Sequence, residues 1–356
     1  MADLHLYPLW TMNNHRFKTR RWFFSFFSFV VFAGLFYPLG SVLRFSSPFD
    51  FTTYDAVAKS QLSFLPPQHQ PETTSHQRPR FAYVTLSYGE DICPPLTVTM
   101  NVRNVLNEHS KYAQQTDVII LRLGELIPPD LMPKGVQQRP IQETVMKGKF
   151  SGWKHTYSKF WIARMDEYDA VLFLDSDVLL YKDLDDLIDV ALNLEEGSIV
   201  APRAYWYKQQ PTAMTGTFVI RPCRQHPPQG PLKLLHALLE ENTTQEAFGL
   251  SEMDWFNHYL VHNITLVSGF YTLLTGEFYS YDGAYAYWQR QRNQTAALVL
   301  QDAPLIHFIS RWKPWKKGIA MAKKNMTEQI IQIYKDWNQL KEQACPTSNE
   351  SNGAKI

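Results

Sequence analysis

Two aspartates, Asp175 and Asp177, stand at the end of a short apolar segment and are the first candidates for chemistry. The segment, residues 170–174 (AVLFL), is unbroken in its apolar character, which suits a strand buried on both faces of a parallel sheet. Open α/β sheets bind ligands at the carboxyl ends of their strands. Two carboxylates this close repel each other unless a cation compensates them. A divalent ion, Mn²⁺ or Mg²⁺, would do so and keep open positions for phosphate oxygens; the alternative is a solvated strand end.

The elements that would position these aspartates alternate between strand and helix. Strands are predicted at 81–87 and 117–123, a helix begins near Leu96, and a helix at 156–165 leads into strand 170–174. The later predicted elements are helix 184–192, strands 199–201 and 217–220, helices 232–239 and 253–260, and a C-terminal helix with Ile330, Ile331, Tyr334 and Trp337 on one face. This alternation predicts an α/β fold with a mostly parallel, Rossmann-like sheet flanked by helices.

The composition suits one large α/β domain or two small ones. The chain has 356 residues, of which 45% are hydrophobic, so it has ample material for a core. A formal net charge of +1 gives no reason to expect nucleic acid as a partner. The three cysteines, Cys93, Cys223 and Cys345, fit no zinc pattern and allow one disulfide.

The N-terminal region reads as a membrane anchor. A basic tail, residues 1–21, precedes residues 22–43, which carry no charge and would span about 30 Å as a helix. The positive flank predicts that the N-terminus faces the cytosol. A cleaved signal peptide, the alternative, would need a shorter apolar core and a small-residue cleavage site. We therefore expect a single-pass type II anchor.

The rest of the chain is expected to be luminal. Residues 44–80 are rich in Pro, Gln and His and predict a flexible stem, followed by a catalytic domain at 81–340 and a polar tail at 341–356. Sequons for N-glycosylation occur only after the apolar span, at Asn242, Asn263, Asn293, Asn325 and Asn349. Asn263 begins an apolar stretch, so we expect it to be poorly accessible.

Four blocks of the sequence resemble the glycogenin-like branch of glycosyltransferase family 8, in that family's order. They are FAYVTLSYGEDI at 81–92, TYSKFWIARMDEYDAVLFLDSDVLL at 156–180, TGTFVIRP at 215–222 and LIHFISRWKPW at 305–315. The DxD motif alone is weak evidence, but a lysine sixteen residues before it and a distant H-F-(x)4-K-P-W block make the pattern specific. The resemblance implies a GT-A fold and a retaining transferase that uses a UDP-sugar donor.

The resemblance also implies roles for particular residues. Asp175, Asp177 and His307 would hold Mn²⁺ or Mg²⁺, and Lys313 would meet the diphosphate. Contacts with the nucleotide or sugar are expected from Leu86, Tyr88, Lys159, Ser176, Thr215 and Gly216, and catalytic roles from Lys159, Glu252 and Asp254. The structural alternatives are a surface lysine for Lys159, a core histidine for His307, and favourable acids at a helix N-terminus for Glu252 and Asp254.

The expected function is transfer of a sugar to a glycan or glycoprotein acceptor at the Golgi membrane. The departures from the family pattern lie around the donor sugar: Ile92, Met214, Met253 and Ser310. They leave open a non-catalytic carbohydrate-binding or scaffold protein of the same fold. A haloacid-dehalogenase-like phosphatase also has an hhhhDxDxx strand, with Asp175 as its nucleophile, but in that class this strand begins the domain.

Overall fold

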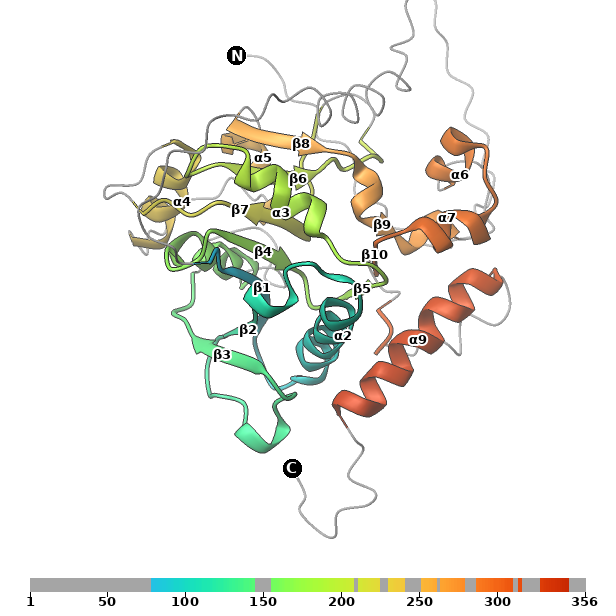
Figure 1. Ribbon diagram of the computed structural model, residues 1–356, viewed down its shortest axis with the longest axis horizontal. Helices are drawn as coiled ribbons and strands as arrows, with labels where there is room; N and C mark the ends of the chain where they lie inside the picture. Colours follow the sequence, from blue (N-terminus) through green and yellow to red (C-terminus); the bar gives the residue numbers. More distant parts are fainter. Residues whose placement is uncertain are drawn as a thin grey trace, which may run out of the picture. The chain divides into compact units, whose positions relative to one another are not determined.

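The computed structural model describes residues 78–144, 155–207, 211–224, 230–240, 251–260, 263–278, 286–309, 313–315 and 327–345 (Figure 1). The predicted basic tail, the membrane anchor, nearly all of the stem and the polar tail after residue 345 lie outside these ranges. Within them, no helix has the length and apolarity that crossing a membrane requires.

A seven-stranded sheet runs through the described domain, in the order β3-β2-β1-β4-β7-β6-β8 (Figure 1). Its strands are β1 (Phe81–Ser87), β2 (Thr116–Arg122), β3 (Val136–Pro140), β4 (Ala170–Leu174), β6 (Ile199–Pro202), β7 (Thr217–Ile220) and β8 (Ile264–Val267). Strands β1 to β4 are mutually parallel, whereas β7 is antiparallel to both of its neighbours. The α/β class with a mostly parallel sheet is therefore confirmed, with β7 as the exception.

Strand β4 is buried on both faces, as its apolar run predicts. Leu172 and Leu174 face one core, together with side chains of α2 (Cys93–His109), α3 (Asp185–Leu192) and α9 (Glu328–Ala344). Val171 and Phe173 face the other core, with η4 (Thr156–Arg164), α4 (Gly230–Glu240) and α5 (Glu252–Leu260). The alternation of side chains along the strand thus holds two helical layers against one sheet.

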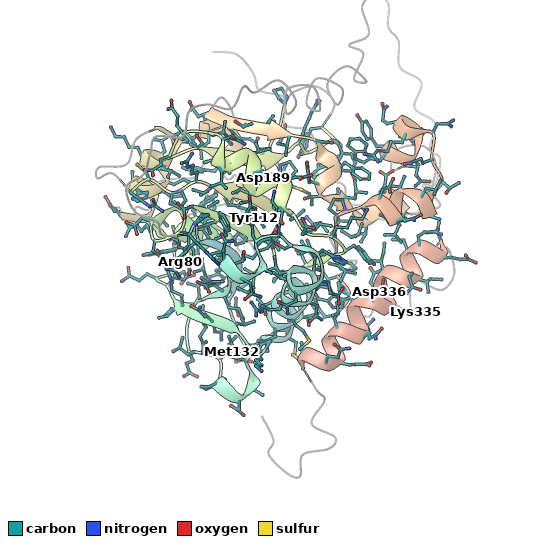
Figure 2. All side chains as sticks on the ribbon, in the orientation of Figure 1. Arg80, Tyr112, Met132, Asp189, Lys335 and Asp336 are labelled. Carbon is teal, nitrogen blue, oxygen red and sulfur yellow. A yellow bond between two sulfur atoms is a disulfide. The ribbon has the colours of Figure 1, made fainter. Side chains whose placement is uncertain are left out.

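Polar contacts also join helix α3 to the segment that precedes β2. Figure 2 labels Tyr112 and Asp189, and the tyrosine hydroxyl donates a hydrogen bond of 2.5 Å to the Oδ1 atom of Asp189. Lys111 donates to the Oδ2 atom of the same carboxylate at 2.5 Å. These contacts attach the segment before β2 to α3.

A second, three-stranded sheet was not predicted from the sequence. It contains β5 (Val178–Leu180), β10 (Leu305–His307) and β9 (Leu273–Leu274), in the order β5-β10-β9. Strand β10 is antiparallel to β5, with His307 opposite Val178, and parallel to β9, with His307 opposite Leu274. The strand that follows the DSD segment is thereby paired with the strand that carries His307.

Several sequence-based boundaries differ from those observed. The turns at 156–164 are a 3-10 helix rather than an α-helix, and α2 begins before Leu96 because Pro94 and Pro95 suit a first helical turn. On α9 the buried face uses Ile333, while Ile331 is half-buried. The remaining short elements are η1 (Ala113–Gln115), η2 (Pro129–Leu131), η6 (Gly269–Tyr271), η7 (Thr275–Phe278), α6 (Tyr287–Arg292) and α7 (Ala296–Asp302).

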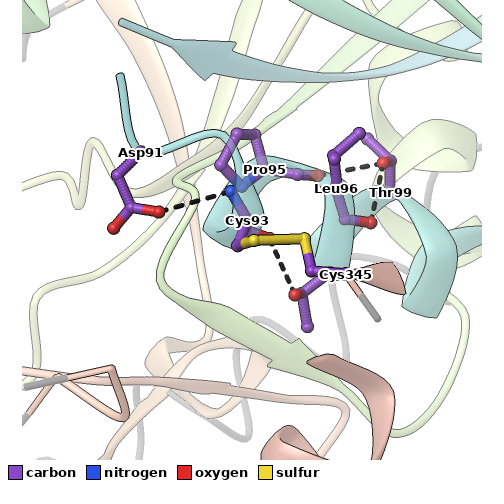
Figure 3. The surroundings of a disulfide bond; sticks show 7 residues. Asp91, Cys93, Pro95, Leu96, Thr99 and Cys345 are labelled. Atoms are coloured by element: carbon purple, nitrogen blue, oxygen red, sulfur yellow. Dashed lines mark hydrogen bonds between the residues drawn. A yellow bond between two sulfur atoms is a disulfide. The ribbon is translucent and has the colours of Figure 1, made fainter. Parts of the chain in front are cut away.

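A disulfide joins the start of α2 to the residue after α9. Cys93 and Cys345 are bonded with their Cα atoms 5.8 Å apart, across a sequence separation of 252 residues (Figure 3). Asp91 accepts a hydrogen bond from the backbone N–H of Cys93 at 3.3 Å. Helix α9 therefore continues beyond the domain end predicted at residue 340, and the first residue after it is covalently fastened to α2. Cys223 lies buried in the core on the other face of the sheet.

Candidate active site

The DSD segment links β4 to β5 at the carboxyl edge of the large sheet. The backbone N–H of Asp175 donates to the carbonyl of Gly216 at 2.9 Å, and Phe308 N–H donates to the carbonyl of Asp177 at 2.9 Å. The antiparallel pairing of β5 with β10 continues this contact and brings His307 beside the two aspartates. Backbone pairing therefore assembles residues that are far apart in sequence.

The side chains of Asp175, Asp177 and His307 form a group that fits a divalent cation. One ligand atom from each residue lies within 4.8 Å of the others. His307 Nε2 is 3.0 Å from Asp177 Oδ1 and 3.8 Å from Asp175 Oδ2. Burial lowers the pKa of His307, which favours the neutral imidazole that can act as a metal ligand. Two carboxylate oxygens and one imidazole nitrogen suit Mn²⁺.

Gly216 is required by the close packing around this group. A Cβ atom at this position would lie 2.7 Å from His307 Cε1 and 3.0 Å from Asp175 Oδ2. Neither neighbour is free to withdraw, because His307 belongs to β10 and Asp175 follows β4. The small residue in the TGT segment therefore lets β7 begin directly against the proposed metal ligands.

Lys159 is buried at the centre of a polar cluster, with only 1% of its surface exposed. Its ammonium donates to Asp175 Oδ1 at 2.8 Å, Glu252 Oε1 at 3.1 Å and the Thr215 carbonyl at 3.2 Å. Burial alone would lower the pKa of Lys159, but Asp175 and Glu252 outweigh it and raise the pKa, so the lysine stays charged.

The geometry gives Lys159 protein partners, and its expected contact with the nucleotide or sugar stays a prediction. An ammonium group has three N–H donors, and all three are taken up by protein oxygens. The surface alternative is wrong, because the side chain is enclosed. Lys159 instead holds the carboxylates of Asp175 and Glu252 in fixed positions, which makes it a positioning residue.

Glu252 and Asp254 have different surroundings, although both lie in the first turn of α5. Glu252 Oε2 accepts a hydrogen bond from the Thr156 hydroxyl at 3.0 Å, and its Oε1 atom contacts Lys159. Asp254 is exposed, and its Oδ2 atom accepts from the backbone N–H of Ser251 at 3.0 Å and from the Ser251 hydroxyl at 2.8 Å. These are helix-capping contacts, so Glu252 joins the cluster and Asp254 stands outside it.

Thr156 was given no role by the sequence reasoning. The signal was present in the spacing, because Thr156 and Lys159 are three residues apart in one helical segment and so lie on the same face. Both side chains reach Glu252 from that face.

Lys313 contributes a second cation, which pairs with Asp177 whereas Lys159 pairs with Asp175. The Nζ atom of Lys313 also donates to the carbonyl of Phe308. The pKa of Asp175 would be raised by burial, but the charges of Lys159 and Lys313 oppose burial, and the pKa is lowered. When His307 is neutral, the charged groups of this site are the carboxylates of Asp175, Asp177 and Glu252 and the ammonium groups of Lys159 and Lys313. Their sum is one negative charge, which a bound cation would compensate.

The predicted nucleotide contacts lie along β1 and the DSD turn. Tyr88 follows β1, its ring is exposed, and its centroid is 5.2 Å from that of His155. Partial burial and the charge of Asp175 raise the pKa of Tyr88. Leu86 is buried within β1, and Ser176 is half-buried between the two aspartates. Their contacts with a nucleotide stay predictions.

A family model described as glycosyl transferase family 8 matches residues 107–318, more than half of the chain. The chain therefore belongs to glycosyl transferase family 8. This membership gives no support to the phosphatase interpretation, and neither does the sheet, because β1, β2 and β3 precede β4.

Similar proteins include two fungal relatives and two solved structures. Glucose N-acetyltransferase 1 of Gibberella zeae is 23% identical over 267 residues, which cover 66% of this chain and 53% of the relative. The protein of the same name from Aspergillus fumigatus is 26% identical over 187 residues, or 49% of this chain and 47% of the relative. The chain thus spans about half the length of the curated relatives it matches.

Among solved structures, the galactosyltransferase LgtC in complex with donor and acceptor sugar analogs has a TM-score of 0.49 at 14% identity. That alignment covers 74% of this chain and 95% of LgtC. The apo form of the glycosyltransferase GlyE of Streptococcus pneumoniae has a TM-score of 0.46 at 16% identity, covering 74% of this chain and 63% of GlyE.

Proposed function

We propose that this protein is a retaining glycosyltransferase of the glycogenin-like branch, which transfers a sugar from a UDP-sugar to a glycan or glycoprotein. The observation that carries the proposal is the group of Asp175, Asp177 and His307 at the carboxyl edge of β4, flanked by Lys159 and Lys313. A bound Mn²⁺ or Mg²⁺ would supply a counter-charge for the leaving diphosphate. Retention of configuration rests on the family resemblance.

The protein groups divide between binding and positioning. Asp175, Asp177 and His307 hold the ion. Lys313 binds diphosphate oxygens, to which its ammonium group donates charge-assisted hydrogen bonds. Glu252 faces the start of β7, where its Oε1 atom accepts from the Thr215 hydroxyl at 3.3 Å, and we assign it the catalytic contact with the donor sugar. Lys159 fixes the orientation of Glu252.

A luminal position at the Golgi membrane, with the anchor at residues 22–43, is part of the proposal. The Cys93–Cys345 disulfide supports it, because such bonds persist in oxidising compartments. Two of the sequons, Asn263 and Asn293, lie among the described residues, and both are exposed. For Asn263 this corrects the expectation of poor access. Endoglycosidase should lower the apparent mass, and protease added to intact microsomes should spare the domain.

The function is tested by UDP release from UDP-glucose, UDP-galactose, UDP-N-acetylglucosamine, UDP-glucuronic acid and UDP-xylose with Mn²⁺. The full chain, purified in detergent, should turn over one of them, and EDTA should abolish turnover. Asp177→Asn should reduce the rate by about 10²–10³ because preorganised charge stabilisation is lost. Asp189→Asn is the matched control. Asp189 lies on α3, and its carboxylate contacts Lys111 and Tyr112 instead of the metal group.

The outcomes separate the candidate functions. Full activity in EDTA, or an active Asp177→Asn enzyme, would show that the DSD segment is only a strand terminus. A folded protein that turns over none of the donors would instead favour the non-catalytic carbohydrate-binding alternative.

A further inference from the structure

The connection between β6 and β7 lies at the same sheet edge as the candidate active site. Strand β7 is antiparallel to β4, so it begins beside the point where β4 ends, with Thr217 opposite Leu174. The connection is held in place by backbone pairing of Arg203 with Ala213. The side chain of Asn257 on α5 also clamps Ala213, accepting from its N–H at 2.6 Å and donating to its carbonyl at 2.8 Å.

Tyr205 anchors this connection to the strand next to His307. Its ring is buried, and its hydroxyl accepts a hydrogen bond from the backbone N–H of Leu274 at 3.1 Å. Leu274 is the register partner of His307 in the small sheet. A Cβ atom at Gly269 would lie 2.5 Å from the Arg203 carbonyl and 3.1 Å from Tyr205 Cβ, so the glycine is what permits this close packing.

The next two residues present aromatic rings to solvent. Trp206 is 36% exposed and Tyr207 is 43% exposed. The Trp206 ring packs edge-on against Tyr205, with centroids 5.2 Å apart, and is 6.1 Å from the ring of Tyr207. Rigid rings with polar tips suit an amphipathic ligand such as a sugar.

The sheet order separates this surface from the predicted nucleotide contacts. Asp175 follows β4, which lies between β1 and β7. Tyr88 follows β1 on one side of Asp175, whereas Trp206 and Tyr207 belong to the β6–β7 connection on the other side. A nucleotide bound near Tyr88 would therefore direct its sugar across the metal group toward the aromatic pair.

We propose that Trp206 and Tyr207, held by Tyr205, form the subsite that binds a sugar ring of the acceptor glycan. This inference rests on the proposed transferase function.

The test is binding of the full chain, in detergent, to an array of oligosaccharides that end in glucose, galactose, N-acetylglucosamine, mannose or xylose. For the glycans that the wild type binds, Trp206→Ala and Tyr207→Ala should each lower the affinity by about tenfold or more, equivalent to about 1.4 kcal/mol. Trp206→Phe and Tyr207→Phe should keep most of the affinity, because the rings remain. Leu234→Ala is the matched control, since Leu234 on α4 is 42% exposed.

Calorimetry of UDP with Mn²⁺ on the same proteins separates this inference from the proposed function. Weaker glycan binding with unchanged UDP affinity supports the acceptor subsite. The acceptor subsite would be overturned if the alanine variants bound glycans as tightly as the wild type, or if the wild type bound none. A loss of UDP affinity that matches the loss of glycan affinity would overturn it as well. A wild type that neither binds UDP nor turns over a UDP-sugar would overturn the transferase function, whatever the array shows.

Discussion

Replacing Lys159 by methionine should destabilise the fold far more than the loss of an ordinary lysine. The methionine keeps much of the side-chain volume and removes the charge that lies between Asp175 and Glu252. Two of the lost hydrogen bonds run to carboxylates, at 2.8 and 3.1 Å, and each such bond contributes about 1.5–3 kcal/mol. Breaking a buried ion pair on one side costs about 3–5 kcal/mol, so we expect the free energy of unfolding to fall by that amount.

The matched control is Lys111→Met. Lys111 also pairs with a carboxylate, Asp189, at 2.5 Å, but its side chain is exposed. Exposed pairs contribute about 0–1 kcal/mol. Urea unfolding of both variants, followed by circular dichroism, gives the comparison. If Lys159→Met is no less stable than Lys111→Met, the buried cluster does not hold the carboxylates as described.

The pH dependence of the Lys159→Met deficit provides a second readout. In the wild type the pKa of Asp175 is lowered, so its contribution to stability is lost as the pH falls. In the variant, buried carboxylates without their cation have raised pKa values, so stability is lost as the pH rises. The first effect acts only below about pH 5. The second effect alone therefore makes the deficit larger at about pH 8 than at about pH 5. A deficit that does not change with pH would show that lost packing, rather than uncompensated charge, is the cause.

Three further predictions concern other parts of the domain. Replacing Cys93 and Cys345 together by serine should lower the free energy of unfolding by about 4–5 kcal/mol, since the bond spans a long loop; an unchanged midpoint in non-reducing denaturant would contradict this. Glu277 is 1% exposed, and burial raises its pKa from 4.5 to about 7. The contribution of Glu277 to the free energy of unfolding, about 3 kcal/mol, is therefore present below about pH 4.5 and lost as the pH rises through 7. Glu277→Gln should flatten this dependence of stability on pH in thermal melts. A variant with the same pH dependence as the wild type would refute the assignment. Lys313→Ala should weaken UDP binding by about tenfold or more in calorimetry, as one charge-assisted contact is lost; unchanged affinity would rule out contact with the diphosphate.

Local sequence patterns predicted most of the elements and the composition of the metal group. The apolar run at 170–174 has one arrangement that buries every side chain, a strand covered on both faces, and that is where β4 lies. Helical periodicity likewise located α3, α4 and α5 to within a few residues. Strands β3 and β8 were missed because only part of each is buried, so their apolar signal is weak.

The sequence alone determined that Asp175, Asp177 and His307 are candidate ligands and that the chain resembles a glycosyltransferase family, because motif spacing and local apolar runs are properties of neighbouring residues. Only the tertiary structure decided that β10 pairs with β5 and brings His307 to Asp177. It also enclosed Lys159 between carboxylates, which rules out the surface position that the sequence left open, and it paired Cys345 with Cys93. These contacts join residues far apart in the chain, and they form only when strand pairing and two-sided burial of the sheet bring those residues together.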